Sequence, residues 1–564
     1  MQTSPKAVRA ISVLLFIDGL IAIGCAIFAH ALGFDPNPDW GRSRIFLFLF
    51  GGSLLALSIF LRRKIPAFIS SDATKTFTII GHTWAVILVI YVWFITFGTF
   101  TEWRASTRYY SLLVDAFSKG QLHVDVEPGA ALLAADDPYN NEGRPPFDDD
   151  VWDLSLYKGK LYLYWGPVPA LLLTPIQLVL NKDLADIYPV FFFFCGLLIL
   201  NSLIALKMRR LFFADIPMRN VTASLLVLGL ILPIPWSLSI PDVYEAAIGA
   251  GQFFLIGGIY FVILAFEYLL KPPSPAAGTP PKAGLLLFLA GLFWACSVGS
   301  RAINVLSIFF LTAFTLYWIW KTCVNDWTKS TAPLLTPLAL GAILIGWYNY
   351  ARFDDPLEFG LRYQITVQNM NRDMPLAFEL EYLPHNFTAY VLQPFQFVSG
   401  FPFIRPVGYT GLIQDRGITA PGLYAAGNVT GVLFFAPFLL LAFLPFVKPK
   451  PPGGKEAQAS DLQRFILYLL GGSFLIGFTS ILFYYYGQMR FLVDVISQIT
   501  LLAVFGYWTV VRRFPKAYLY FANLLIVITL TISLLLSVTS ESGRMEKLNP
   551  VLTDRLDSLF VGQK

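Results

Sequence analysis

Residues 188–210 read YPVFFFFCGLLILNSLIALKMRR. The apolar block 188–207 is long enough to cross about 30 Å of hydrocarbon as a helix, and Lys207, Arg209 and Arg210 mark its end. The rest of the chain has the same character, since 56% of its 564 residues are hydrophobic and only 14% are charged. Soluble domains carry about 25% charged residues. The sequence therefore predicts an all-α polytopic membrane protein.

Thirteen apolar blocks are long enough to be candidate membrane spans. The first block is too long, and matches a small-residue cleavage site too poorly, to be a removable signal peptide, so we expect it to be retained as a span. The seventh block is the shortest. The blocks lie at 9–32, 45–61, 77–100, 188–207, 220–239, 247–270, 284–299, 303–320, 333–350, 427–447, 464–485, 491–511 and 517–538.

Basic residues orient these spans, because Lys and Arg are favoured in short cytoplasmic loops. With the N-terminus in the cytoplasm, the cytoplasmic segments hold most of the Lys and Arg residues of the short loops. The short outer loops then hold only Arg42, Arg44, Arg301 and Arg490. This asymmetry predicts a cytoplasmic N-terminus and an outer C-terminal tail.

Residues 166–180, GPVPALLLTPIQLVL, are apolar but contain three prolines, and a crossing here would place Lys207 on the outside. We expect them to lie along the outer membrane interface as a juxtamembrane segment. Two large outer loops result, 101–187 and 351–426. The first is predicted to hold an amphipathic surface helix within 104–119 and an irregular segment at 127–150. Residues 273–281 and 449–454 are predicted to be cytoplasmic linkers.

Metal-binding and nucleic-acid-binding signals are weak. The four cysteines and four histidines are scattered, without His-x-x-x-His or Cys-x-x-Cys spacing, so neither a zinc site nor a disulfide framework is predicted. The net charge of +5 does not indicate nucleic-acid binding. The run Asp148-Asp149-Asp150 could bind a divalent cation, although a solvated acidic turn is the simpler interpretation. The cofactor requirement is therefore open, and the sequence itself requires no metal.

Five groups of polar residues occur at predicted outer positions where the membrane disfavours them. The first, 151–169, reads VWDLSLYKGKLYLYWGPVP. A Lys-Gly turn could close a hairpin here, and strict alternation would put Tyr157 on the face opposite to Lys160, Tyr162 and Tyr164. A carboxylate such as Asp153 beside lysines and phenols can act as a general base next to an anion site. A solvated interfacial hairpin rich in Tyr and Trp is the alternative.

Two further groups lie on tight outer turns. Glu245, in PDVYE, opens a predicted helix, where the helix dipole alone would favour a carboxylate. Functional and structural interpretations of Glu245 are equally open. Arg301 follows Ser300 in a short apolar hairpin, so its guanidinium must snorkel to the surface or bind an anion such as a lipid phosphate.

The last two groups border the second large loop and a late span. Arg352 and Arg362, with aromatic neighbours such as Tyr363, could hold a phosphate and stack on a sugar, or belong to an interfacial aromatic belt. Arg490 and Asp494 are four residues apart and could pair with each other on one helix face. All five groups map to the outer surface. Arginines are disfavoured in short loops on that side, so their presence there favours an anionic ligand at the outer surface.

The order of these features resembles the GT-C superfamily of membrane glycosyltransferases, particularly its aminoarabinose-transferase and protein-mannosyltransferase branches. The resemblance covers most of the chain. It rests on the surface helix RYYSLLVDAFSKGQL, the juxtamembrane segment YLYWGPVPALLLTP, the span end LIALKMRRLF, the loop opening YNYARFDDPLEFGLRYQ and the span entry GQMRFLVD.

With 77–100 as the first span of the superfamily core, the resemblance implies a division of the chain into five parts. These are two additional spans in 1–76, the core in 77–350 with the first outer loop at 101–187, the second outer loop at 351–426, the C-terminal spans at 427–538 and an outer tail at 539–564.

The superfamily branches place an acidic motif at the start of the first outer loop. The matching stretch here, TEWRASTRYY, offers Glu102, with Ala105 and Ser106 in the nearest matching places. Glu102, Asp115 and Asp153 therefore all remain candidates for the catalytic carboxylate, and we prefer Asp153 because of its neighbours. The substrate-binding residues implied by the resemblance are Lys160, Tyr162, Tyr164, Glu245, Arg301, Arg352, Arg362, Tyr363 and Arg490.

The resemblance implies direct displacement at the anomeric carbon of a polyprenyl-phosphate-linked sugar, with arginines neutralising the departing phosphate. The expected partners are this donor, a glycan, lipid or protein acceptor, and membrane lipids, with no nucleic acid. The expected location is the bacterial inner membrane, with the active site on the outer face. The alternatives are a lipid-linked sugar transporter or flippase, which would favour inverted repeats and midplane polar residues, and a polysaccharide polymerase.

Overall fold

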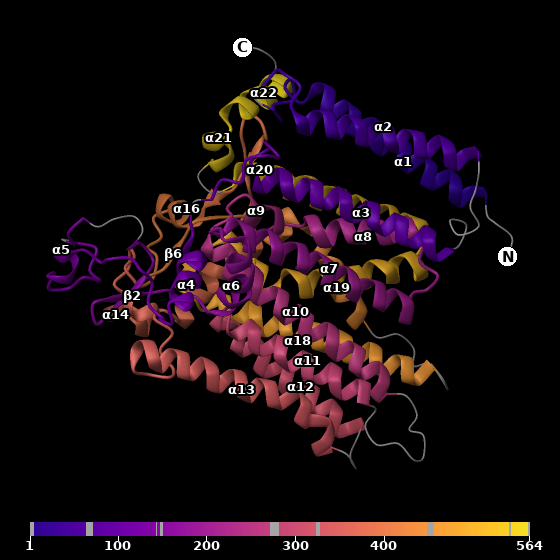
Figure 1. Cartoon of the computed structure of the whole chain (residues 1–564). Coiled ribbons are helices and arrows are strands. Elements are labelled where there is room, and N and C mark those ends of the chain that lie inside the picture. The colour runs from indigo at the N-terminus through magenta and orange to yellow at the C-terminus, as the bar shows by residue number, and fades with distance from the viewer. Residues whose placement is uncertain are drawn as a thin grey trace.

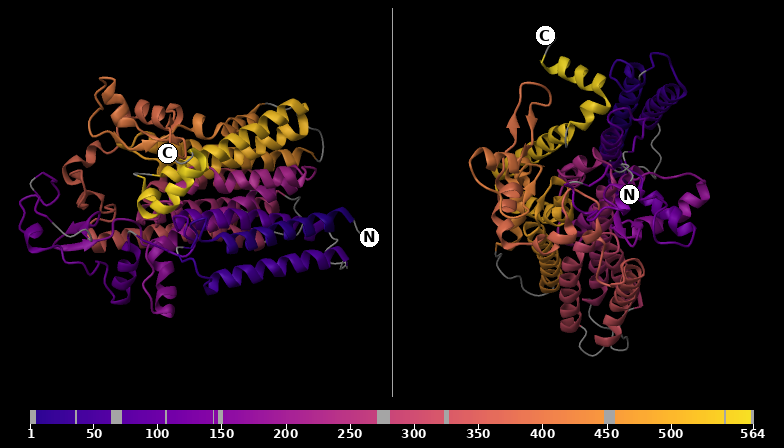
Figure 2. Two further views of the ribbon diagram at one scale, coloured as in Figure 1. Left: turned by 90° about the horizontal axis from the view of Figure 1, so that it is seen from above. Right: turned by 90° about the vertical axis from the view of Figure 1, so that its left-hand side faces the viewer.

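The computed structural model describes residues 5–561 except residues 36, 64–71, 106, 143, 147–150, 271–280, 323–326, 448–455 and 541–542. The acidic run at 148–150 and the expected linkers at 273–281 (apart from Pro281) and 449–454 lie outside the described residues. In the described part, long helices run side by side, and elements of both large loops gather at one end of the bundle (Figure 1, Figure 2). We refer to this end as the loop end.

Nine of the described helices are long and apolar enough to cross a membrane, and each coincides with a predicted span. The predicted class of all-α polytopic membrane protein is therefore confirmed. These helices are α1 (Pro5–Phe28), α3 (Asp72–Ile95), α7 (Ile187–Phe212), α10 (Val243–Leu269), α12 (Val305–Thr322), α13 (Trp327–Phe353), α18 (Glu456–Leu482), α19 (Val493–Arg513) and α20 (Lys516–Thr539).

The predicted number of thirteen spans is not confirmed, because the four other blocks form shorter apolar helices in the described part of the chain. Prolines interrupt two of these blocks, since proline lacks the N–H that continues a helix. The block 220–239 divides into α8 (Met218–Leu230) and α9 (Ile234–Leu238), with Pro233 between them. The other shorter apolar stretches are Ser43–Ile59 of α2 (Arg42–Arg63), Lys282–Val298 of α11 (Pro281–Val298) and, within 427–447, α17 (Val432–Phe435) followed by the 3-10 helix η9 (Pro437–Phe446).

Helix α19 lies at the centre of the bundle. Nearly all of its residues are buried, and it packs against α7, α8, α10, α18, α20 and η9. Its buried Gln498 accepts a hydrogen bond from Gln252 Nε2 of α10 at 2.7 Å. Such interhelical bonds satisfy polar groups that have no water to bind. The central position of α19 fixes the location of Asp494, which lies in its first turn.

The first two helices, α1 and α2, form a hairpin that packs beside α3. Arg44 of α2 is buried, and its Nε donates to the carbonyl of Ala26 at 3.0 Å while its Nη2 donates to that of Ile27 at 3.2 Å. These bonds satisfy carbonyls in the last turn of α1 that have no partner within the helix. Asp18 of α1 pairs with His82 of α3, with 2.6 Å between Oδ2 and Nε2.

The C-terminal tail, α21 (Arg544–Leu548) and α22 (Pro550–Val561), runs back over the loop ends of α1 and α3. Arg555 Nη1 donates to the carbonyl of Ala31 at 2.9 Å, and Asn549 Nδ2 donates to that of Phe97 at 2.9 Å. Gly98 has a φ of +81°, and a Cβ there would lie 2.2 Å from Leu552 Cδ2. Glycine is favoured at this position by its backbone conformation, and a Cβ there would also displace the Leu552 side chain.

The first large loop contains α4 (Tyr109–Ser118), α5 (Ala130–Leu133), β1 (Ser155–Tyr157), β2 (Lys160–Tyr162) and α6 (Val168–Leu180). A helix is present within the predicted range 104–119, although most of its residues are buried, Ser111 of the expected polar face among them. The predicted Lys-Gly hairpin is also present. Lys158 and Gly159 have φ values of +48° and +74°, as a tight two-residue hairpin turn requires. The strict alternation was wrong for Tyr157. It pairs directly with Lys160 across the hairpin, and directly opposed residues lie on the same face of a sheet.

The second large loop consists of short elements. Four of its strands form two antiparallel pairs, and β6 (Ala425–Ala426) pairs with β8 (Tyr486–Gly487), which precedes α19. The elements are η5 (Leu361–Tyr363), α14 (Met370–Asp373), η6 (Met374–Leu376), η7 (Leu380–Tyr382), α15 (Leu383–Phe387), η8 (Thr388–Leu392), β3 (Gln396–Phe397), β4 (Ile404–Arg405), β5 (Val407–Gly408), α16 (Tyr409–Asp415), β6 (Ala425–Ala426) and β7 (Asn428–Val429).

Candidate active site

Asp153 lies where the two large loops meet. Its backbone N–H donates to the carbonyl of Ile365 at 2.9 Å, and Gln364 Nε2 donates to its Oδ1 at 3.1 Å. Its Oδ2 accepts a hydrogen bond from the hydroxyl of Tyr244, in the first turn of α10. Its φ is +62°, a region that few residues other than Gly, Asn and Asp adopt. Burial raises the pKa of the Asp153 carboxyl, and hydrogen bonds from Tyr244 and Thr366 oppose this effect.

Arg490, in η10 (Met489–Leu492), places its guanidinium beside the same tyrosine. Its Cζ lies 4.0 Å from the centre of the Tyr244 ring, and its Nη1 lies 3.4 Å from Glu245 Oε1. Glu245 is buried at the N-terminus of α10. The positive charge of Arg490 also counteracts the effect of burial on the pKa of Asp153. Asp153, Tyr244, Glu245 and Arg490 therefore form one group at the start of α10.

Arg301 provides a second guanidinium, just before η3 (Ala302–Asn304). Its Nε donates to Asp494 Oδ1 at 3.0 Å, and its Nη2 lies 2.8 Å from Asp494 Oδ2. Asp494 is therefore bound by Arg301, and the alternative in which it pairs with Arg490 is wrong. Among the described residues, nothing forms a hydrogen bond with Arg301 Nη1. This amino group is available to a ligand.

Aromatic side chains connect the two arginine groups. The Cζ atoms of Arg301 and Arg490 lie 5.4 Å and 5.8 Å from the centre of the Phe491 ring. Burial, Tyr484 and Asp153 raise the pKa of Tyr164, whereas Arg301 and Arg490 lower it. The Tyr164 hydroxyl therefore stays protonated at neutral pH.

The Gly-Pro break after the hairpin is packed against the turn that carries Arg301. The N–H of Val168 donates to the carbonyl of Gly299 at 3.1 Å. A Cβ on Gly166 would lie 2.0 Å from the same carbonyl oxygen, so only glycine allows this approach. Two groups that the sequence analysis treated separately, the 151–169 stretch and the Ser300-Arg301 turn, are therefore in direct contact.

An aromatic cluster surrounds Phe353 at the end of α13. The rings of Tyr157, Tyr162 and Tyr363 lie with their centres 5.8 Å, 5.4 Å and 5.7 Å from that of Phe353. The Tyr157 hydroxyl donates to Asp354 Oδ2 at 2.8 Å. Tyr162 and Tyr363, which the sequence analysis assigned to substrate binding, are therefore brought together, and they link the hairpin to the second large loop.

Arg352 has a structural environment that the sequence analysis did not anticipate. It is buried, its Nη1 donates to the carbonyl of Leu163 at 2.6 Å, and its Nη2 donates to Asn349 Oδ1 at 2.9 Å. Its Cζ lies 3.8 Å from the centre of the Tyr348 ring. These contacts hold the 151–169 stretch onto α13, and they occupy the guanidinium that was expected to bind phosphate.

Lys160 and Arg362 lie toward solvent. Lys160 is exposed on β2. The Arg362 side chain is 50% exposed, and its Nε is 3.8 Å from Glu358 Oε2. An exposed pair at this distance contributes little to stability. Both side chains can move toward a ligand, and their predicted roles in substrate binding stay predictions.

The other two candidate bases lie in different surroundings. Glu102 forms a surface ion pair with Arg104. Asp115 Oδ1 accepts a hydrogen bond from Gln177 Nε2 at 3.3 Å, which joins α4 to α6. Of the three candidates, Asp153 is the one whose carboxylate contacts the group that contains Arg490.

Asp186 is a buried carboxylate that the sequence analysis missed. Its two oxygens accept the backbone N–H groups of Tyr109 and Tyr110 at 2.9 Å and 3.0 Å, so it holds the N-terminus of α4. Burial raises its pKa to about 6 in spite of these hydrogen bonds. The sequence signal, an aspartate directly before a span, is typical of capping of the following helix. It does not reveal a bond to a helix 76 residues earlier.

A metal site was left open by the sequence. Within the residues that the structure describes, no group of three or more His, Cys, Asp and Glu side chains is placed to hold a metal ion. The run at 148–150 lies outside that part of the chain.

An apolar groove of about 510 Å³ lies between α6 and α7. Its lining includes Leu172, Ile176, Tyr188 and Phe192, and Lys182 is the charged residue at its edge. The groove begins close to the contact between α6 and the turn before Arg301.

No protein-family model and no curated protein matches the chain. Solved structures of the oligosaccharyltransferase of Archaeoglobus fulgidus resemble it. The apo form is 11% identical, with a TM-score of 0.44 over 82% of this chain and 56% of that one. The same enzyme with a tethered acceptor peptide containing the NVT sequon is 11% identical, with a TM-score of 0.45 over 88% and 56%.

A third structure, AglB from Archaeoglobus fulgidus with an inhibitory peptide and a dolichol-phosphate, is 12% identical, with a TM-score of 0.42 over 82% and 56%. The chain thus spans about half the length of these proteins. They belong to the GT-C superfamily, which is the superfamily that the sequence resembles.

Proposed function

We propose that this protein is a membrane glycosyltransferase that transfers a sugar from a polyprenyl-phosphate donor to an acceptor at the outer face of the membrane. The observation that carries the proposal is the arrangement of two arginines near a buried carboxylate. Arg490 lies against Tyr244, which donates a hydrogen bond to Asp153, and Arg301 lies against Phe491, the ring that Arg490 also contacts. Both arginines oppose the positive-inside trend, and such residues in membrane proteins usually serve a ligand or an ion pathway.

The arginines are held in place before a donor binds. Asp494 fixes the guanidinium of Arg301, and Glu245 that of Arg490. A guanidinium whose geometry is already fixed loses less freedom when it binds a phosphate. Arg301 Nη1 offers the first contact, because Nε and Nη2 are used by Asp494.

Asp153 is proposed as the general base. It accepts the proton of the acceptor hydroxyl as the oxygen attacks the anomeric carbon. The bond between that carbon and the phosphate oxygen breaks, and its electron pair leaves with the polyprenyl phosphate. Arg301 and Arg490 stabilise the negative charge that develops on this leaving group. Tyr244 orients the Asp153 carboxylate through its hydrogen bond.

The donor lipid is proposed to lie in the apolar groove between α6 and α7. The occupant we assign is the polyprenyl chain, since the groove is lined mainly by apolar side chains. The contact between Val168 and Gly299 joins the start of α6 to the turn that carries Arg301. A phosphate bound at Arg301 would therefore have its lipid chain directed along α6.

The test is a transfer and binding assay with the purified full-length protein and a polyprenyl-phosphate sugar. Arg301→Lys retains a positive charge next to Asp494 but loses the planar set of donors. The loss of a charge-assisted contact in a partly desolvated site predicts a donor affinity roughly 10- to 100-fold lower. Arg362→Lys is the matched comparison, because Arg362 is the exposed alternative as a phosphate ligand.

Two outcomes would contradict the proposal. If Arg362→Lys weakens donor binding and Arg301→Lys does not, the phosphate site lies in the second large loop. If the wild-type protein moves the lipid-linked sugar across vesicle membranes without breaking its phosphate bond, the protein is a flippase and Asp153 has no role as a base.

A further inference from the structure

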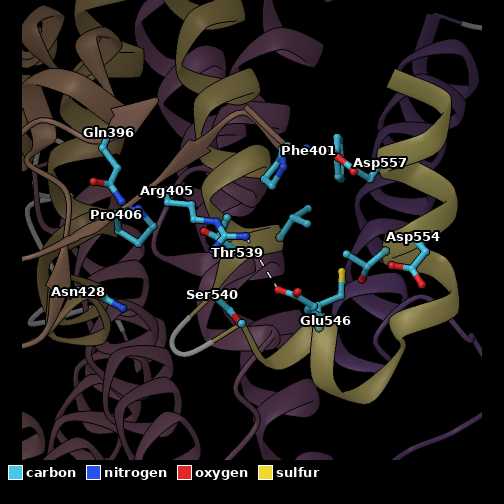
Figure 3. A pocket seen from close by; sticks show the side chains of 16 residues that line it. Gln396, Phe401, Arg405, Pro406, Asn428, Thr539, Ser540, Glu546, Asp554 and Asp557 are labelled. Carbon is cyan, nitrogen blue, oxygen red and sulfur yellow. Dashed lines mark hydrogen bonds and ion pairs between the residues drawn. The ribbon is translucent and has the colours of Figure 1, made fainter. Parts of the chain in front are cut away.

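A second cavity lies away from the group around Asp153, between the second large loop and the C-terminal tail. It has a volume of about 400 Å³, within the range of small-molecule sites. The β3–β4 hairpin forms one side, and the end of α20 with α21 and α22 forms the other (Figure 3).

The lining of this cavity is polar and carries an excess of carboxylates. Glu546, Asp554 and Asp557 come from the tail, whereas Arg405 is the one basic residue among the lining residues. Arg405 Nη2 lies 3.9 Å from Glu546 Oε2, so part of its charge is already balanced. An anionic ligand is therefore disfavoured here.

The carboxylates are dispersed around the cavity. Among the described residues, no three acidic side chains come together in the way that a metal ion requires. Figure 3 shows them at separate places on the wall, together with the amides of Gln396 and Asn428. Separate hydrogen-bond acceptors of this kind match a ligand that carries several hydroxyl donors.

Two further features indicate a ligand. Ser540 lines the cavity and is only 2% exposed, and its Oγ has no hydrogen-bond partner within the described part of the chain. A buried polar atom without a partner is rare and requires an explanation. Phe401 stacks on Phe560, with ring centres 5.2 Å apart and planes 9° apart, and Asp557 Oδ1 accepts the N–H of Phe401 at 2.7 Å. An aromatic side chain is therefore held rigidly at the rim.

We propose that this cavity is a saccharide-binding subsite for the acceptor, and that it takes a neutral or amino-bearing sugar unit. The carboxylates, the amides and Ser540 would pair with sugar hydroxyls, and Phe401 would pack against the apolar face of the ring. This assignment rests on the proposed glycosyltransferase function, since it names the class of acceptor.

The tail links this cavity to the group around Asp153. Arg544 lies between two lining residues, Gly543 and Met545, and its Nη1 is 2.8 Å from Asp242 Oδ2. Asp242 is the residue before α10, two positions from Tyr244. A sugar unit in the cavity would therefore belong to an extended acceptor whose reacting end lies nearer to α10.

The experiment uses the full-length protein in detergent with fluorescently labelled trisaccharides. The probes are mannotriose (neutral), chitosan triose (amino-bearing) and trigalacturonate (anionic). We expect binding of at least one of the first two and no binding of the third. Asp554→Asn should weaken binding by about 10-fold through the loss of a charge-assisted bond, and Gln396→Ala should weaken it less, because its amide makes a neutral hydrogen bond. Asp415→Asn, an exposed carboxylate of α16 outside the cavity, is the matched control and should bind as the wild type does.

The two proposals fail in different ways. Trisaccharide binding does not require turnover, whereas release of polyprenyl phosphate from the donor measures the proposed function directly. Wild-type turnover without any trisaccharide binding would overturn the subsite alone. Tighter binding of trigalacturonate than of mannotriose, or unchanged binding in both cavity variants, would also overturn it. Binding that depends on Asp554 in a protein without donor turnover would support the subsite and reject the proposed transfer reaction.

Discussion

Replacement of Asp153 by Asn tests the proposed base with little change in shape. The Asn oxygen can accept the hydrogen bond from Gln364 Nε2, and the Asn amino group can donate to Tyr244, because a phenol hydroxyl both donates and accepts. The variant therefore exchanges charge-assisted bonds for neutral ones, and we expect a loss of about 1 kcal/mol in the free energy of unfolding. Expression and thermal unfolding should be close to those of the wild type.

The rate of transfer should fall far more. General-base catalysis typically contributes 10²–10⁴-fold, so we expect Asp153→Asn to lower kcat at least ~100-fold, equivalent to about 2.7 kcal/mol in the barrier. The assay is transfer of a radiolabelled sugar from a polyprenyl-phosphate donor under single-turnover conditions. Donor affinity should change little, because Asp153 is not assigned to the phosphate.

The pH profile gives an independent readout. Asp153 must be ionised to accept a proton, so the rate should rise with pH through the pKa of its carboxyl. Because burial raises this pKa, the rising part of the profile should lie above the ordinary range of aspartate. Glu102→Gln and Asp115→Asn are the controls, and Asp115→Asn should mainly lower protein yield. Near-full activity of Asp153→Asn together with an inactive Glu102→Gln would refute the assignment and move the base to Glu102.

Three further predictions concern structure. Arg352→Met should leave the carbonyl of Leu163 and Asn349 Oδ1 without these hydrogen bonds and lower the free energy of unfolding by about 3 kcal/mol. A loss of donor affinity with unchanged thermal stability would instead favour the phosphate role. The pKa of Asp186 is about 6 in the folded protein and about 3.9 when unfolded. The stability that Asp186 contributes is therefore fully present below about pH 4 and is lost as pH rises through about 6. The unfolding temperature of Asp186→Asn should lack this dependence on pH. Reporter fusions after positions 130, 210, 390 and 455 should read outside, inside, outside and inside, and an inside result at 130 would reject the predicted orientation.

The sequence predicted those parts of the fold that depend on local pattern. Apolar length identified the nine long helices, and the Lys158-Gly159 pair identified a hairpin turn. The number of spans was less predictable, because hydropathy is averaged over a window and does not detect a change of backbone geometry inside it. The block at 427–447 is strongly apolar, yet it contains α17 and the 3-10 helix η9 in place of one long helix.

The sequence identified most residues of the candidate site but not which of their side chains contact each other. Arg301 and Asp494 are 193 residues apart, and Asp153 and Gln364 are 211 residues apart, so no local pattern connects them. An arginine beside aromatic residues gives the same sequence signal whether it binds a phosphate or a backbone carbonyl. Arg352 proved to bind a carbonyl, and only the fold distinguishes the two.

The contact between α22 and the N-terminal hairpin has a consequence for the order of assembly during synthesis. Arg555 and Ala31 are 524 residues apart, so at 5–20 residues per second the ribosome needs roughly 25–100 s to make the second partner after the first. During that interval α1 and α2 are held beside α3 by contacts such as that between Asp18 and His82. The hairpin gains its contacts with α22 only after that helix has been made, so a helix translated late in synthesis completes the packing of two that were translated early.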